Sequence, residues 1–378
     1  MKIKPTGYYS WKTDDFKLAK GCQLCVKGSK MVLFATGICP RHCFYCPVSE
    51  KKHQKDVVYA NEWKISSDKD MIEECILTEA KGSGITGGDP LARLPRVLKY
   101  IGMLKKKFGK NFHIHLYTPP DLLSIPTLKK LYSAGLDEIR VHPDIFSNKL
   151  WHKVDLLKKF KWSVGMEIPV LPDAEKQLSN LIFNMIGKVD FINLNELEIS
   201  DTNAQNLVGR GYFPKDKISY GVKGCDKLAK KLMKKFGDKI PIHYCTCKLK
   251  DKVQMANRIK IRAKNVAKKF DIVTNEGMLI RGAIYLPKIL PGFDYEKRLL
   301  KVNNIITLKK LNKTKNELAK NFKIPKNLLD VDEKRYRLLT NIGVVEHLAK
   351  VLKKMNLVPA IVEEYPTWDA IQLDITFI

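Results

Sequence analysis

Three cysteines fall within eight consecutive residues of this chain, at Cys39, Cys43 and Cys46. The apolar run at residues 31–36 leads into them and predicts a β-strand, and Pro40 biases the residue before it towards an extended backbone. We therefore expect a loop that wraps a metal cluster. Because three thiols cannot occupy all four corners of a four-iron cluster, one iron would keep an open position for a small molecule.

This spacing, with Tyr45 just before the last cysteine, resembles the signature of the radical S-adenosylmethionine (radical SAM) superfamily. The resemblance implies a [4Fe-4S] cluster held by the three cysteines, with S-adenosylmethionine (SAM) bound at its open iron. It further implies that an electron from the cluster cleaves SAM to methionine and a 5'-deoxyadenosyl radical. Tyr45 would then lie beside the adenine of the bound cofactor.

A zinc ribbon is the alternative interpretation, because a second Cys-x-x-Cys pair stands upstream at Cys22 and Cys25. The next strand-like segment favours the cluster. It ends in Gly87, Gly88 and Asp89, which resemble the motif by which the superfamily binds the amino group of SAM. The superfamily usually has glutamate where this chain has Asp89. A Gly-Gly pair alone would indicate only a tight turn.

Strand-like and helical segments then alternate along the chain, which is typical of a parallel sheet with right-handed crossovers. Expected strands are residues 31–36, 84–86, 112–118, 138–142, 163–171 and 191–194. Expected helices are residues 68–81, 94–108, 122–134, 145–160 and 174–186. The pattern resembles the partial (βα)6 TIM-like barrel of radical SAM enzymes, an α/β fold, here with an N-terminal cysteine knuckle and a small C-terminal α+β domain.

Sites in parallel barrels lie at the carboxyl ends of the strands. The candidates there are Tyr117, Thr118, Arg140, His142, Glu167, Asn193, Asn195 and Glu196. Glu167 resembles the fifth-strand residue that lines the nucleoside pocket of the superfamily, and Arg140, Asn193 and Asn195 are the further candidates for cofactor binding. The polar strand end around Asn193 is equally well explained by capping and turn chemistry. His113 and His115 share one strand face and are expected to be ordinary core or surface histidines.

Four thiols stand outside the radical motif, at Cys22, Cys25, Cys245 and Cys247. Four cysteines can close a zinc site or hold an auxiliary iron-sulfur cluster. A Cys-x-Cys pair within a strand places both side chains on one face, which favours joint ligation. The alternatives are that one of this pair is simply buried, or that the two pairs do not meet.

The expected organisation is a lead-in at 1–30, the radical SAM core at 31–200, an extension at 201–290 and a C-terminal domain at 291–378. The extension includes a basic amphipathic helix at 251–270 that offers Arg258, Arg262, Lys264 and Lys268 to solvent or to an anion. The C-terminal domain is expected to contain a helix at 335–355 and strands at 360–364 and 370–377. Trp368 is either a stacking platform for a base or a core residue.

The net charge of +28 arises from 68 basic against 40 acidic residues, so an RNA substrate would be attracted. Dispersed lysines on solvated faces are the alternative explanation. No apolar run approaches the ~20 residues that span a bilayer, so a membrane is not an expected partner. The start carries no apolar signal core, and cysteines spaced for metal suit a reducing compartment, so a cytoplasmic location is expected.

Taken together, residues 39–196 carry the firm resemblance, and the chain resembles archaeal-type radical SAM proteins related to pyruvate formate-lyase activating enzyme. Three functions follow as hypotheses. The first is a radical SAM enzyme that modifies a macromolecule such as RNA. The second is an activase of a glycyl-radical enzyme, or another peptide- or small-molecule-modifying radical SAM enzyme. The third is a noncatalytic metal-stapled RNA-binding or redox-sensing protein. For the enzymes, a ferredoxin or flavodoxin is the expected electron donor.

Overall fold

The computed structural model describes residues 2–6, 10–14 and 16–378. Its contacts divide the chain into two units, Met1–Arg258 and Ile259–Ile378, each with a core of its own. This division lies before the expected boundary at residue 291. The reason is that residues 272–285 pair with strands of the C-terminal sheet.

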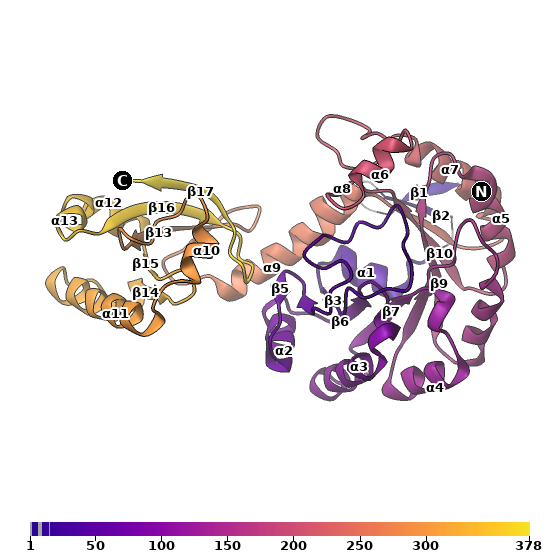
Figure 1. Ribbon diagram of the computed structural model, residues 1–378, viewed down its shortest axis with the longest axis horizontal. Coiled ribbons are helices and arrows are strands. Elements are labelled where there is room, and N and C mark those ends of the chain that lie inside the picture. Colours follow the sequence, from indigo (N-terminus) through magenta and orange to yellow (C-terminus); the bar gives the residue numbers. More distant parts are fainter. Residues whose placement is uncertain (1, 7–9, 15) are drawn as a thin grey trace. The chain divides into compact units, whose positions relative to one another are not determined.

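The first unit is built on a curved sheet with the strand order β1-β2-β11-β10-β9-β8-β7-β6-β3-β4-β5 (Figure 1). Neighbouring strands from β3 to β11 in this order run parallel. Their bounds are β3 (Lys30–Phe34), β6 (Gly82–Thr86), β7 (His113–Thr118), β8 (Glu138–Val141), β9 (Ser163–Val170), β10 (Phe191–Glu196) and β11 (Ile242–Cys245). The first six confirm the partial (βα)6 barrel, and β11 adds a seventh strand at its end.

Short antiparallel strands form the two edges of this sheet. These are β1 (Ile3–Pro5), β2 (Ser10–Thr13), β4 (Tyr59–Ala60) and β5 (Trp63–Lys64). β1 and β5 are the outermost strands among the described residues, so the barrel stays open.

Helices connect the parallel strands and cover the outer face of the sheet (Figure 1). They are α2 (Asp68–Leu77), α3 (Leu94–Phe108), α4 (Ile125–Ala134), α5 (Glu175–Met185) and α7 (Cys225–Phe236), with 3-10 segments η1 (Pro90–Arg93), η2 (Pro120–Leu122) and η3 (Trp151–Lys159). In α3, Val97, Ile101 and Leu104 recur at helical spacing and are completely buried. The expected helix at 145–160 is only the 3-10 segment η3.

The lead-in differs from the expected cysteine knuckle because it contains a helix, α1 (Lys20–Val26), that carries both Cys22 and Cys25. Figure 1 shows α1 inside the curve of the sheet, and it contacts β3, β6 and β7. Gly21 permits this approach, because a Cβ there would lie 2.4 Å from His115 Nδ1 and 2.7 Å from Arg140 Nη2. The helix therefore fills the amino-terminal end of the barrel.

The segment after β10 contains a short helix, α6 (Ala204–Gly209), and then α7 and β11. β11 ends at Cys245, and α8 (Cys247–Leu249) begins two residues later, followed by η4 (Lys250–Met255) and α9 (Ala256–Val266). The expectation that Cys245 and Cys247 share one strand face is therefore wrong, because the strand ends between them.

The second unit is an antiparallel sheet with the order β14-β15-β13-β16-β17, to which β12 is added beside β13. The strands are β12 (Ile272–Val273), β13 (Leu279–Tyr285), β14 (Leu329–Asp332), β15 (Arg337–Thr340), β16 (Val358–Glu364) and β17 (Gln372–Phe377). The helices are α10 (Tyr295–Leu299), α11 (Asn304–Asn321), α12 (Ile342–His347) and α13 (Ala349–Lys354), with a 3-10 turn η5 (Lys326–Leu328). The expected helix at 335–355 begins late, because residues 337–340 form β15 instead.

Buried ion pairs hold this second sheet together. Arg337 is completely buried, and its Nη2 donates to Glu364 Oε2 at 2.7 Å while its Nε donates to Asp332 at 2.9 Å. Arg281 donates to the same Glu364 carboxylate at 3.2 Å. These ion pairs link four strands, β13, β14, β15 and β16.

Of the helices in the described part of the chain, none combines the length and the apolar character needed to cross a membrane.

Candidate functional site

A cavity of about 480 Å³ opens at the carboxyl ends of the parallel strands within the first unit. Its walls include all three cysteines of the loop, both glycines of the Gly-Gly segment and the polar ends of β7 to β11. The sequence-predicted residues on its walls are Cys22, Cys25, Cys39, Cys43, Tyr45, Cys46, Gly87, Gly88, Tyr117, Thr118, Arg140, His142, Glu167, Asn193, Asn195, Glu196 and Cys245. Asp89 and Cys247 are not among its lining residues.

The cysteine loop is anchored to the barrel by Arg41. Its Nε donates to Asp121 Oδ2 at 2.7 Å, and its Nη1 donates to the carbonyl of His142 at 3.0 Å. Asn203 Nδ2 donates to the carbonyl of Tyr45 at 3.1 Å. These bonds hold the loop over the strand ends before any metal binds, which reduces the ordering cost of cluster binding.

The Gly-Gly segment is bonded directly to the start of the cysteine loop. Gly88 N donates to Thr36 O and Asp89 N donates to Ile38 O, both at 2.8 Å. A Cβ on Gly88 would lie 2.6 Å from the carbonyl oxygens of Gly37 and Ile38, closer than any real contact. The glycine is therefore required by close approach of two backbone segments.

Asp89 lies behind the cavity wall, completely buried, and caps the 3-10 turn η1. Its Oδ1 accepts hydrogen bonds from Thr118 Oγ1 at 2.8 Å and from Leu91 N at 3.0 Å, while Oδ2 has no partner among the described residues. Burial raises the pKa of Asp89 to about 6. The residue acts on the cavity through Thr118, which lines the wall.

Glu167 is the hub of the opposite wall. Its carboxylate accepts hydrogen bonds from Arg140 Nη1 at 2.8 Å, from Asn193 Nδ2 at 2.9 Å and from Asn195 Nδ2 at 2.9 Å. Burial opposes ionisation of Glu167, but Arg140 and the two amides outweigh it and lower the pKa of the carboxyl. Four residues from β8, β9 and β10 are thereby fixed in one network. The hydrogen bonds to Glu167 account for Asn193 and Asn195 without the alternative of capping and turn chemistry.

The hydrogen bonds of His142 fix the tautomer of its imidazole ring. His142 Nδ1 lies 2.8 Å from the carbonyl oxygen of Glu167, so Nδ1 must carry the proton and donate. The other nitrogen, Nε2, then accepts from the Tyr45 hydroxyl at 3.1 Å. Burial lowers the pKa of His142, which favours this neutral form. The pair orients the Tyr45 ring beside the loop cysteines.

The residues of the cavity fit the cluster and SAM. The soft thiols of Cys39, Cys43 and Cys46 suit iron-sulfur ligation and leave one corner open. On the far wall, Asn193 Oδ1 is buried and has no hydrogen-bond partner in the described structure, so it can accept from a hydroxyl or ammonium group of a ligand. The cradle is narrow at Gly88, where a side chain would displace the loop.

The auxiliary cysteines are only partly brought together. Cys22, Cys25 and Cys245 line the cavity, whereas Cys247 is buried elsewhere and its N–H donates to Glu196 Oε2 at 2.8 Å. Two further cysteines are packed in the core: Cys75 Sγ donates to Met31 Sδ at 3.3 Å, and Cys225 Sγ donates to the carbonyl of Val170 at 3.1 Å.

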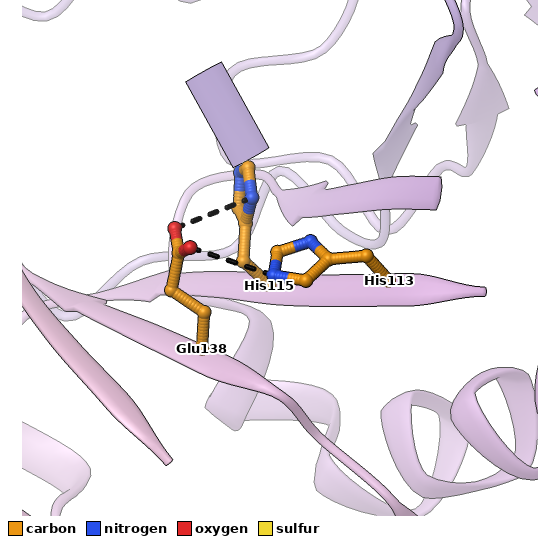
Figure 2. A group of neighbouring side chains, drawn as sticks. All are labelled: His113, His115 and Glu138. Atoms are coloured by element: carbon orange, nitrogen blue, oxygen red, sulfur yellow. Dashed lines mark ion pairs between the residues drawn. The ribbon is translucent and has the colours of Figure 1, made fainter. Parts of the chain in front are cut away.

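His113, His115 and Glu138 lie in the inner part of the barrel, where they form the cluster drawn in Figure 2. Their potential ligand atoms all lie within 4.8 Å of one another. However, Lys30 Nζ already contacts His115 Nδ1, and Arg140 Nε donates to Glu138 Oε1 at 2.6 Å. Burial, Lys30 and Arg140 together lower the pKa of His115 well below its usual value. Because His115 and Glu138 already have these partners, we interpret the cluster as a polar network of the core.

Several residues of the cavity wall were missed by sequence reasoning. Lys30, His243, Lys250 and Gln254 all line it. Lys250 forms an ion pair with Glu198, and His243 Nε2 lies 2.6 Å from Ser10 Oγ. Of these four residues, only His243 could have been found from the sequence. It stands two residues before Cys245 on a strand, and side chains two residues apart lie on the same face.

The expectation that the basic helix offers its charges to solvent or to an anion is wrong for its two arginines, whereas Lys264 and Lys268 are exposed. Arg258 donates two hydrogen bonds to Glu62, at 2.6 and 2.8 Å, and Arg262 donates to the carbonyl of Pro366. Both arginines are buried. Trp368 is half-buried, with Lys334 Nζ 4.3 Å from its ring centroid.

Comparisons with known proteins identify the family of this chain. The family model described as the radical SAM superfamily matches residues 33–183. A protein of Methanocaldococcus jannaschii described as a "putative glycyl-radical enzyme activating enzyme" is 39% identical over 371 residues, covering 95% of this chain and 92% of that protein.

Two solved structures are more distant. SuiB of Streptococcus suis bound to S-adenosylmethionine is 12% identical, with a TM-score of 0.40 over 58% of this chain and 51% of that chain. Coproporphyrinogen III oxidase (HemN) of Escherichia coli is 12% identical, with a TM-score of 0.30 over 91% and 94%. These scores are too low to carry an argument, so the assignment depends on the family match and the 39% identical relative. On that evidence the chain belongs to the radical SAM superfamily, enzymes that use SAM and a [4Fe-4S] cluster.

Proposed function

We propose that this enzyme cleaves SAM reductively in the cavity and abstracts a hydrogen atom from a residue of a polypeptide substrate, as an activase of a glycyl-radical enzyme does. The observation that carries the proposal is that three loop thiols, the Gly-Gly segment and the polar ends of β7 to β10 line one cavity. When bound, the cluster supplies the electron for SAM cleavage.

The residues of the chain have separate tasks in this proposal. Cys39, Cys43 and Cys46 hold the cluster, and the backbone at Gly87 and Gly88 receives the amino acid part of SAM. Asn193 and Asn195, fixed by Glu167, face the nucleoside. Tyr45 closes one side of the site. An electron donor such as a ferredoxin or flavodoxin would approach from outside, and the net charge of +28 favours an acidic redox partner.

The polypeptide substrate is supported by two points. The 39% identical relative spans almost the whole of both chains, and its description is that of an activating enzyme. In addition, a cavity of about 480 Å³ lies within the range for small ligands and is too small to enclose a folded polypeptide. A large substrate must therefore present one residue at the opening.

RNA is the second candidate, and the net charge is the observation that favours it. Two of the charges that the sequence assigned to an anion are, however, engaged within the protein, at Arg258 and Arg262. This leaves dispersed lysines as the source of any attraction. Membership of an enzyme superfamily speaks against the noncatalytic hypothesis.

A hydrogen-transfer experiment distinguishes these substrates. The anaerobic, reconstituted and reduced enzyme is supplied with SAM and with either deuterium-labelled cellular protein or deuterium-labelled cellular RNA from the source organism. We expect deuterium in 5'-deoxyadenosine, read by mass spectrometry, only with labelled protein. Transfer from RNA alone would establish the second candidate, and cleavage with transfer from neither would indicate a small-molecule substrate. Absence of 5'-deoxyadenosine under every condition would contradict the proposal.

A further inference from the structure

We propose that Cys22, Cys25 and Cys245 hold a second iron-sulfur cluster in the cavity that takes SAM, and that Cys247 is not a ligand. This goes beyond the proposed function, because SAM cleavage requires only the cluster of the cysteine loop. It also revises the four-cysteine site expected from the sequence to a three-cysteine site with one open position.

The three thiols come from two elements that meet inside the barrel. Cys22 and Cys25 are three residues apart on α1, so they lie on the same side of that helix. Cys245 is the last residue of β11, next in the sheet to Asn195 of β10. All three line the same cavity, and Cys22 Sγ lies 3.3 Å from Asn193 Nδ2, on the strand whose Asn195 pairs with Cys245.

Buried N–H groups converge on these sulfur atoms. Cys22 Sγ accepts from Asn193 Nδ2 at 3.3 Å and from Arg140 Nη2 at 3.4 Å, and Cys245 Sγ accepts from Gln254 Nε2 at 3.7 Å. Arg140 is 2% exposed and Asn193 is 3% exposed. Hydrogen bonds of this kind stabilise thiolate ligands of iron-sulfur clusters and adjust their reduction potentials. A set of ordinary core thiols would not need such donors.

A buried lysine on the same wall is compatible with an anionic ligand. Lys30 is 4% exposed and lines the cavity. It contacts His115, beside Glu138 and Arg140, and burial lowers the pKa of its ammonium group. A cluster with three thiolate ligands carries negative charge and would favour the charged form of Lys30.

The ligand set favours a cluster over a structural zinc ion. Structural zinc sites are closed by four protein ligands, whereas three thiols leave a corner free. The fourth cysteine is not available, because Cys247 starts α8, does not line the cavity and lies against Glu196. Another donor on the cavity wall is His243, whose Nδ1 is buried without a partner in the described structure. Zinc held by three cysteines and His243 is thus the competing site.

The deciding sample keeps the proposed ligands and removes the first cluster. The full-length variant Cys39→Ala/Cys43→Ala/Cys46→Ala is reconstituted anaerobically with iron and sulfide, and its iron, sulfide and zinc are measured together with the EPR spectrum after reduction. We expect about four iron per chain and a cluster signal, against about eight iron in the wild type. SAM cleavage is lost in this variant, so retained iron does not depend on the proposed function.

Two companion variants test the ligand assignment. Cys22→Ala/Cys25→Ala/Cys245→Ala should lose about half of the iron of the wild type, and Cys247→Ala should lose none. Circular dichroism shows whether each variant is folded. The proposal is overturned if the folded Cys39→Ala/Cys43→Ala/Cys46→Ala variant holds no iron, if it holds one zinc in place of iron, or if Cys247→Ala loses as much iron as the variant lacking Cys22, Cys25 and Cys245.

Discussion

Arg140 Nη1 donates to Glu167 Oε2 at 2.8 Å across the neighbouring strands β8 and β9, inside the barrel. Both side chains line the cavity, and the carboxylate also accepts from Asn193 and Asn195. Glu167 therefore has little remaining capacity to bind a ligand itself. Its effect on SAM would come through the two asparagines that it orients.

Replacing Glu167 by glutamine tests this positioning role. The amide nitrogen would replace one carboxylate oxygen and turn N–H groups towards one or two of the three donors, so we expect Glu167→Gln to lower the free energy of unfolding by about 1–3 kcal/mol. Misplaced asparagines should raise KM for SAM more than they lower kcat. Urea unfolding and the rate of 5'-deoxyadenosine release measure the two effects. Glu175→Gln, which affects a surface pair with Lys231, is the control. Equal behaviour of the two variants would contradict the role.

Gly88→Ala should disrupt the contact between the Gly-Gly segment and the cysteine loop. The added Cβ would lie 2.6 Å from two carbonyl oxygens, so one backbone segment must move. We expect loss of SAM cleavage and a reduced iron content. Gly102→Ala in α3 is the matched control, because no atom lies within 4 Å of its added Cβ, and it should stabilise the helix by up to about 1 kcal/mol. Full activity of Gly88→Ala would show that the close approach is dispensable.

Cys43→Ala should abolish SAM cleavage because two thiols remain to hold the first cluster. The matched control is Cys75→Ala, since Cys75 is equally a free cysteine but is packed in the core against Met31. We expect Cys75→Ala to keep its 5'-deoxyadenosine release and to lose only some stability. Cleavage by Cys43→Ala at the wild-type rate would remove the central assignment of the cysteine loop.

Local patterns predicted the parts of the fold that depend on local spacing. The six strands of the barrel were predicted from apolar runs that alternate with helical segments, and the structure confirms the partial barrel. The cysteine loop was predicted from the spacing of its three thiols. The position of α1 could not be read in this way, because its approach to the barrel depends on Gly21 meeting His115 and Arg140, residues about a hundred positions away. Long-range packing of this kind leaves no trace in local periodicity.

The same limit applies to the candidate site. Arg140, Glu167, Asn193 and Asn195 were expected at strand ends, and they share the cavity. Lys30 was missed because the expected strand began at residue 31, and its burial depends on the packing of α1 against β3. Cys247 was included on the assumption that the strand continued, although it ends at Cys245. Where a strand stops depends on its partners, β2 and β10, rather than on its own residues.

Asp89 should make stability depend on pH in an unusual direction. Its folded pKa of about 6 lies above the ordinary value near 4, so the folded state binds the proton more tightly than the unfolded state. Stability from this group is therefore present at low pH and is lost as the pH rises through 6. The free energy of unfolding of the wild type, measured in urea, should fall by about 1 kcal/mol between pH 5 and pH 7 because of Asp89. This contribution should be absent in Asp89→Asn. Parallel pH curves for the two proteins would contradict the raised pKa.

A variant of Arg258 tests whether this arginine of the basic helix binds RNA or stabilises the fold. Its two hydrogen bonds to Glu62 are charge-assisted and largely buried, so Arg258→Gln should lower the free energy of unfolding by about 1–3 kcal/mol. RNA retention should fall no more than in Lys264→Gln, which removes one exposed charge from α9. Urea unfolding and salt-dependent RNA binding separate the two outcomes. The opposite result would be an Arg258→Gln variant that keeps full stability but loses much more RNA binding than Lys264→Gln. In that case Arg258 would bind phosphate rather than Glu62, and the helix would be an anion-binding surface.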